Sequence, residues 1–156
     1  MGVGILVPVP AVHLKSALTT CKQMGRVAFG SNDTKLFERA SEEYGEGLPL
    51  LIYPTQQPPD SEKLSDPGFI SFRGSYVGTI SAVDGKHPKQ SNRPSSTVEE
   101  SSADAEWEMF WEIADLRYLA KIDQIATTNL NSERTGKPLS PAFVPRGPIL
   151  VKASFL

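Results

Sequence analysis

The chain has 156 residues, of which 39% are hydrophobic and 22% are charged, and its formal net charge is -2. This length and composition predict one globular domain over residues 1–156 and argue against a disordered chain. Proteins that bind the phosphate backbone without sequence preference usually carry a strong basic excess. The charge balance therefore disfavours non-specific nucleic-acid binding, but it leaves open a small pocket that recognises one nucleotide.

Cys21 is the only cysteine, which excludes a disulfide within the chain and a zinc site built from several cysteines. A single thiol is typical of a reducing compartment, so we expect a cytoplasmic protein. The first residues, MGVGILVPVP, lack the basic region of a signal peptide. No window approaches the ~18 apolar residues of a membrane span, and we expect no membrane association.

The N-terminal third predicts strands alternating with helices. Ser31, Asn32 and Asp33 are good N-cap residues, and the helix that follows them ends before Gly45. Its apolar residues recur at helical spacing up to Tyr44. The other expected elements are a strand, a helix, a short strand and an apolar strand, at residues 3–9, 11–23, 26–29 and 48–53. A polar loop follows at about 54–68.

Residues 69–83 form the longest predicted β segment. Gly74 and Gly78 lie inside it in the same phase as its apolar residues, which predicts a bulge, a sharp bend or a close approach at these positions. A nearly apolar-free segment follows at about 84–105, and we expect it to be either a mobile loop or a functional lid.

Residues 107–113 alternate as a strand does, with one face made by Trp107, Met109, Trp111 and Ile113. Glu108 and Glu112 lie on the opposite face, which we interpret as solvated. Residues 116–119 are expected to continue into a turn, and residues 149–152 to complete the sheet. The elements together predict an α+β fold with a mixed, strongly curved sheet or pseudo-barrel and two or three packed helices.

Motifs for catalysis and cofactor binding are scarce. The sequence contains no nucleophile elbow, no P-loop and no dinucleotide fingerprint, and we expect no cofactor. His13 and His87 are the only histidines, so a metal site would require them to converge with a carboxylate. His87 follows the longest strand and is a candidate ligand-binding residue, although a solvent-facing loop histidine is the alternative.

The aromatic residues are more informative. Tyr53, Tyr76 and Trp107 lie in or beside predicted strands, where they could either stack on a flat ligand or belong to the core. Arg73 could face a phosphate or a base edge, or it could equally make a plain surface contact. Ser31 and Asn32, at a predicted helix N-terminus, could hold an anionic group.

The order of the segments also resembles a known superfamily. A helix is followed by LIYPT at 51–55, YVGTI at 76–80, a polar insertion, WEMFWEI at 107–113 and GPILV at 147–151. This order is similar to that of the PUA-like superfamily, and most similar to its EVE and ASCH branches, over residues 30–152. The resemblance implies a pseudo-barrel with a cleft that binds RNA or a modified base, with Tyr53, Tyr76, Gly78 and Trp107 at matching positions.

Three functions follow as hypotheses. The first is a recognition module for nucleic acid or a modified nucleotide, with an aromatic-lined cleft and RNA or a modified DNA base as its partner. The second is an accessory subunit that binds a protein partner without catalysis. The third is a metal-dependent hydrolase or nuclease that uses Asp84 and His87. We expect a binding module rather than an enzyme.

Overall fold

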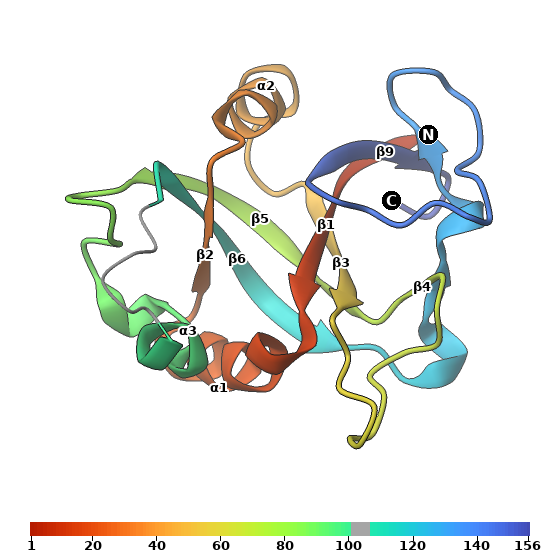
Figure 1. Ribbon diagram of the computed structural model, residues 1–156. Coiled ribbons are helices and arrows are strands. Elements are labelled where there is room, and N and C mark those ends of the chain that lie inside the picture. Colours follow the sequence, from red (N-terminus) through yellow and green to blue (C-terminus); the bar gives the residue numbers. More distant parts are fainter. Residues whose placement is uncertain (101–106) are drawn as a thin grey trace.

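One mixed seven-stranded sheet organises the α+β fold of the computed structural model, which describes residues 1–100 and 107–156 (Figure 1). The strand order is β2-β6-β5-β3-β1-β9-β8. The sheet is not closed, because β2 and β8 remain its two edges. β1 and β3 pair in parallel, and the other neighbours pair antiparallel.

The strands of this sheet are β1 (Gly2–Pro10), β2 (Val27–Ser31), β3 (Pro49–Thr55), β5 (Phe72–Ser81), β6 (Met109–Tyr118), β8 (Asn131–Ser132) and β9 (Ile149–Ala153). β4 (Phe69–Ile70) and β7 (Ile125–Ala126) pair separately. The helices of the described residues are α1 (Leu14–Met24), α2 (Thr34–Tyr44) and α3 (Ser95–Glu100). Short 3-10 turns occur at η1 (Ala11–His13), η2 (Gln90–Asn92), η3 (Lys121–Asp123) and η4 (Thr127–Asn129).

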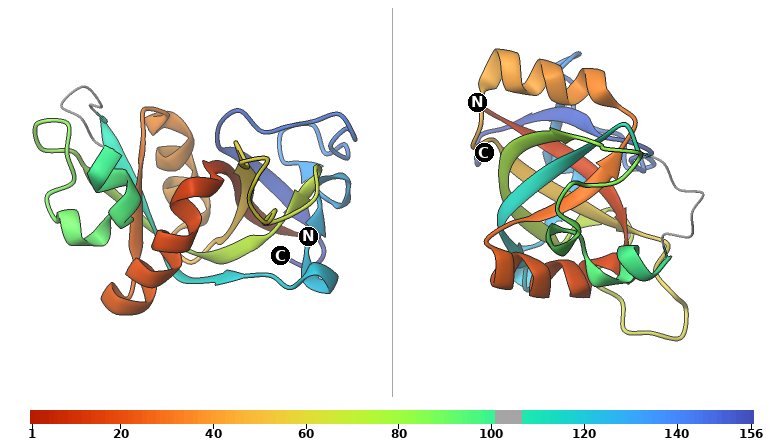
Figure 2. Two further views of the ribbon diagram at one scale, coloured as in Figure 1. Left: turned by 60° about the horizontal axis from the view of Figure 1, so that its bottom comes forward. Right: turned by 90° about the vertical axis from the view of Figure 1, so that its left-hand side faces the viewer.

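The two longer helices have local signals at their ends. The Asp33 carboxylate accepts a hydrogen bond from the Leu36 N–H at the start of α2, as an N-cap does. Gly25 ends α1 in a left-handed conformation with φ of 80°, and its N–H donates to the Cys21 carbonyl. α1 and α3 lie together at one side of the sheet, and α2 lies at the opposite side (Figures 1 and 2).

Two apolar clusters cover the two faces of the central strands. β1 contributes Ile5, Val7 and Val9 to the larger cluster and Leu6 to the smaller one. Burial of both faces explains why β1 and β3 read as nearly continuous apolar runs rather than as alternating patterns. An aromatic stack lies inside the larger cluster: the Trp111 ring centroid is 4.7 Å from that of Phe29 and 6.0 Å from that of Phe37.

The glycines of β5 mark irregularities in its pairing with β6, as expected. The register shifts between Arg73 and Ser75 and again between Tyr76 and Gly78. A Cβ atom at Gly74 would lie 2.6 Å from the Ile113 side chain, and Gly78 has a φ of 118°. Gly74 thus allows a close approach of β6, and Gly78 supplies a left-handed backbone.

Two sequence expectations require correction. Residues 116–119 do not turn, because β6 continues to Tyr118 and pairs with Phe72 of β5. The long segment expected at 69–83 is divided at Ser71 into β4 and β5. The polar segment expected at 84–105 contains η2 and α3 where it is described, and residues 101–106 lie outside the described residues. Whether this segment is a mobile loop or a lid stays a prediction.

Candidate functional site

A cavity of about 260 Å³ lies between β1 and β2, two strands that do not pair with each other. Its lining comes from strand ends, loops, η1 and α3, and these segments are far apart in the sequence. The lining residues are Val7, Pro8, Val9, Pro10, His13, Phe29, Gly30, Ser31, Arg93, Thr97, Trp107, Trp111, Arg146, Gly147 and Pro148. The site therefore combines three large aromatic rings with two arginines.

Trp107 lies against the backbone of β2. A Cβ atom at Gly30 would be 2.4 Å from the indole, so only glycine leaves room for the ring in this position. The backbone N–H of Trp107 donates to the Gly85 carbonyl, and the backbone N–H of Glu108 donates to Asn32 Oδ1 at 3.0 Å. Asn32 thus fixes the backbone beside Trp107, while the half-buried indole faces the cavity.

Arg93 gives the cavity a buried positive charge. The residue is only 9% exposed, and its guanidinium forms no hydrogen bond or ion pair within the described residues. Its Cζ lies 4.9 Å from the centroid of the Phe110 ring, an arrangement that partly stabilises the cation. Burial lowers the pKa of Arg93 to about 10, so the group is still protonated at neutral pH.

An unpartnered buried charge is unusual, because its desolvation is not compensated by hydrogen bonds. Arg93 borders the cavity, so an acceptor placed there is the partner that the fold leaves room for. Arg146 also borders the cavity and is exposed, which places a second positive charge at the rim.

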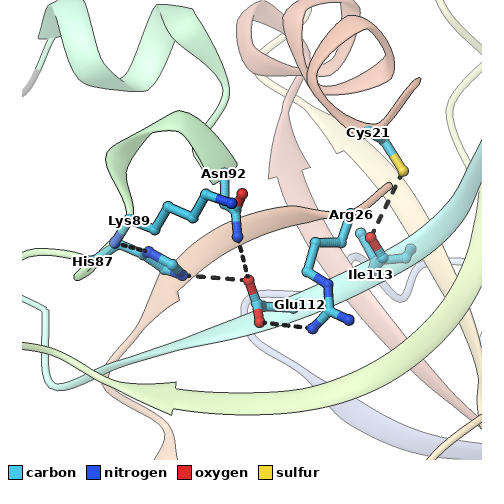
Figure 3. Close-up of polar contacts among 7 residues, drawn as sticks. All are labelled: Cys21, Arg26, His87, Lys89, Asn92, Glu112 and Ile113. Carbon is cyan, nitrogen blue, oxygen red and sulfur yellow. Dashed lines mark hydrogen bonds and ion pairs between the residues drawn. The ribbon is translucent and has the colours of Figure 1, made fainter. Parts of the chain in front are cut away.

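A buried polar cluster joins residues 87–92 to Glu112 of β6 (Figure 3). Glu112 Oε2 accepts from His87 Nε2 at 3.3 Å and from Asn92 Nδ2 at 3.4 Å, and Oε1 accepts from Arg26 at 3.4 Å. The Lys89 N–H donates to His87 Nδ1, which must therefore be unprotonated. The ring is then neutral, with its hydrogen on Nε2 directed at Glu112.

The cluster attaches residues 87–93 to the outer face of β6. His87 contacts the Phe110 ring edge to face, with centroids 5.1 Å apart, and Arg93 covers the same ring. Glu112 and Asn92 hold the backbone immediately before Arg93. These contacts position the arginine that lines the cavity, so Glu112 and His87 act on the site through Arg93.

Two sequence interpretations are wrong here. Glu112 was expected on a solvated face but is only 2% exposed, and the alternative of a solvent-facing His87 fails because that residue is 3% exposed. The physical reason is the same for both. Residues 87–93 cover the outer face of β6, and the polar groups satisfy one another there.

The candidate residues do not form one site. Ser31 and Trp107 line the cavity, and Asn32 supports it. Tyr53 is 7% exposed and its hydroxyl accepts from the Gly68 N–H, whereas Tyr76 is fully buried and hydrogen-bonded to Ser41. Both tyrosines belong to the core, and their side chains do not line the cavity.

Arg73 lies in a different hollow of about 500 Å³, opposite Arg117 of the neighbouring strand. Sequence reasoning missed Arg93 and Arg146, and it did not name Trp111 among the candidate ligand-binding residues. Arg93 lies in a polar run with nothing to indicate that it becomes buried. The aromatic content of residues 107–111 was the available signal for the tryptophans.

Among the side chains of residues 1–97 and 107–156, no group of three His, Cys, Asp or Glu could hold a metal ion. None of the helices in this part of the chain has the length and apolar character needed to cross a membrane. Comparison with protein-family models, curated proteins and solved structures gives no match.

Proposed function

We propose that this protein is a recognition module that takes one base of a nucleic acid, or a modified nucleotide, into the cavity between β1 and β2. The observation that carries the proposal is the joint presence of Trp107, Trp111 and the unpaired, buried Arg93 around one cavity. Aromatic rings bind the faces of bases, and an arginine binds their acceptor atoms.

The size of the cavity supports a single base. Its volume of about 260 Å³ is below the roughly 300–1,000 Å³ of pockets for drug-sized ligands. One ring system would fill the space between the aromatic walls. The sugar and phosphate would then lie at the rim, where Arg146 is exposed. This local charge is compatible with the net charge of -2.

The sheet topology supports a PUA-like pseudo-barrel as the corresponding fold. β1 and β2 are four places apart in the strand order, yet both line one cavity, which requires the sheet to curl. β9 pairs with β1 only as far as Leu6, and Pro8 and Pro10 beyond it have no N–H to donate to β2. The prolines therefore favour a gap between β1 and β2 that no backbone hydrogen bonds cross, and the cavity lies in this gap.

Fluorescence titration with short single-stranded RNA and DNA, including oligonucleotides with modified bases, tests the proposal. The chain has 2 tryptophans and both line the cavity, so a bound base should quench the emission saturably. Replacing Trp107 with alanine should weaken binding about fivefold to a hundredfold, as expected for the loss of one stacking contact.

Arg117→Gln is a matched control for Arg146→Gln, because each removes one exposed positive charge and Arg117 lies in the other hollow. We expect Arg146→Gln to weaken binding and Arg117→Gln to change it little. The proposal fails if the folded protein shows no response to any oligonucleotide by fluorescence or calorimetry.

A protein partner is the second candidate, and the hollow around Arg73 favours it. Ile122 and Phe155 line this hollow and are 92% and 44% exposed, which leaves apolar surface next to two arginines. A hydrolase that uses Asp84 and His87 gains no support, since His87 faces Glu112 and Asp84 is exposed.

A further inference from the structure

We infer that Arg93 makes the cavity selective for guanine, by donating hydrogen bonds to the O6 and N7 atoms of the base. The inference rests on the proposed function and adds the identity of the base. It begins from the one strongly polar group that the described residues leave buried at the cavity without a partner.

The chemistry of the guanidinium restricts the ligand to acceptors. An arginine has only N–H donors and a permanent positive charge at neutral pH. Three aromatic rings around a cavity would otherwise suit a methylated ammonium group, which binds the faces of such rings. The charge of Arg93 repels such a cation, so the ligand must present acceptor atoms to this side of the cavity.

The planar fork of the guanidinium restricts the ligand further, because it matches two adjacent acceptors. The outer edge of guanine carries N7 and O6 side by side, whereas adenine and cytosine place an amino donor on the same edge. Guanine is also a two-ring base, which gives it more contact area with the indoles of Trp107 and Trp111 than a pyrimidine has.

The arginine is also held in place before any ligand arrives. Phe110 supports one face of its guanidinium, and Asn92, the preceding residue, is bound to Glu112. A donor that is already ordered loses little conformational entropy on binding, and it discriminates well between bases that do and do not match it. This rigidity favours selection of one base over general attraction to phosphate.

The test uses short oligouridine RNAs in which only the central residue is changed, to guanosine, adenosine, cytidine or 7-deazaguanosine. We expect the guanosine RNA to bind the wild-type protein roughly 5- to 150-fold more tightly than the adenosine RNA. The 7-deaza compound lacks the N7 acceptor and should lose most of this advantage. Arg93→Lys, which keeps the charge but not the fork, should bind the guanosine and adenosine RNAs equally.

Equal binding of all these RNAs by the wild-type protein overturns the inference and leaves the proposed function standing. A preference of the wild-type protein for the cytidine RNA also overturns the inference, because the adjacent acceptors of cytosine lie on its pairing edge. A uniform loss of affinity in Arg93→Lys would place a phosphate at Arg93 and also overturns it. Failure of every RNA and DNA oligonucleotide to bind contradicts the proposed function itself. The 7-deaza comparison uses only wild-type protein, so it decides the matter even if Arg93→Lys does not fold.

Discussion

Replacing Glu112 with alanine is expected to lower the free energy of unfolding by about 2–6 kcal/mol, because each buried donor left without an acceptor costs roughly 1–3 kcal/mol. Two such donors depend on this carboxylate, His87 Nε2 and Asn92 Nδ2. Arg26, the third partner, has a side chain that is 48% exposed, so water can replace its contact. Urea unfolding monitored by tryptophan fluorescence measures the change.

Glu108→Ala is the matched control, since Glu108 is an exposed glutamate next to the same strand. It should change the stability by no more than about 0.5 kcal/mol. Glu112→Gln keeps one acceptor oxygen, so its free energy of unfolding should fall between those of Glu112→Ala and Glu108→Ala. A loss below about 1 kcal/mol in Glu112→Ala would contradict the cluster, because hydrogen bonds of buried groups would then have little net effect.

Gly30→Ala is expected to weaken oligonucleotide binding about fivefold to a hundredfold, which corresponds to the loss of one base–aromatic stack. The added methyl group would lie 2.4 Å from the Trp107 indole, so the ring must leave its position. Gly30 has no left-handed backbone that alanine would strain. The variant therefore moves Trp107 without removing it, and a shifted emission maximum would report the movement.

Arg117→Gln serves as the control for this variant, because Arg117 lies in the other hollow and away from the cavity. This control should bind oligonucleotides as the wild type does. Unchanged binding by Gly30→Ala, together with a shifted Trp107 emission, would show that the indole is not a stacking surface for the ligand.

Much of the fold could be predicted from local patterns. The N-cap candidates Ser31, Asn32 and Asp33 located the start of α2, and the apolar runs located β1 and β3, since these signals act within a few residues. Gly74 and Gly78 indicated the irregular pairing of β5, because an added side chain at Gly74 would collide with β6 and Gly78 has a left-handed backbone.

The candidate site was less predictable because it depends on contacts between distant segments. Tyr76 and Trp107 are both aromatic residues near strands. The order of the strands in the sheet decides that Trp107 lines the cavity between β1 and β2, whereas Tyr76 packs against α2. The burial of Arg93 and Glu112 depends on residues 87–93 covering β6. The polar sequence of residues 87–93 has no periodicity that would predict such a contact.

The most direct test of the central claim is an NMR titration that follows the indole N–H signals of Trp107 and Trp111 as a guanosine-containing oligonucleotide is added. Both side chains line the cavity between β1 and β2. We predict that both signals shift saturably, with the same dissociation constant as that measured by calorimetry. Saturable binding that leaves both indole signals unchanged would place the ligand elsewhere on the protein and contradict the assignment of this cavity as the binding site.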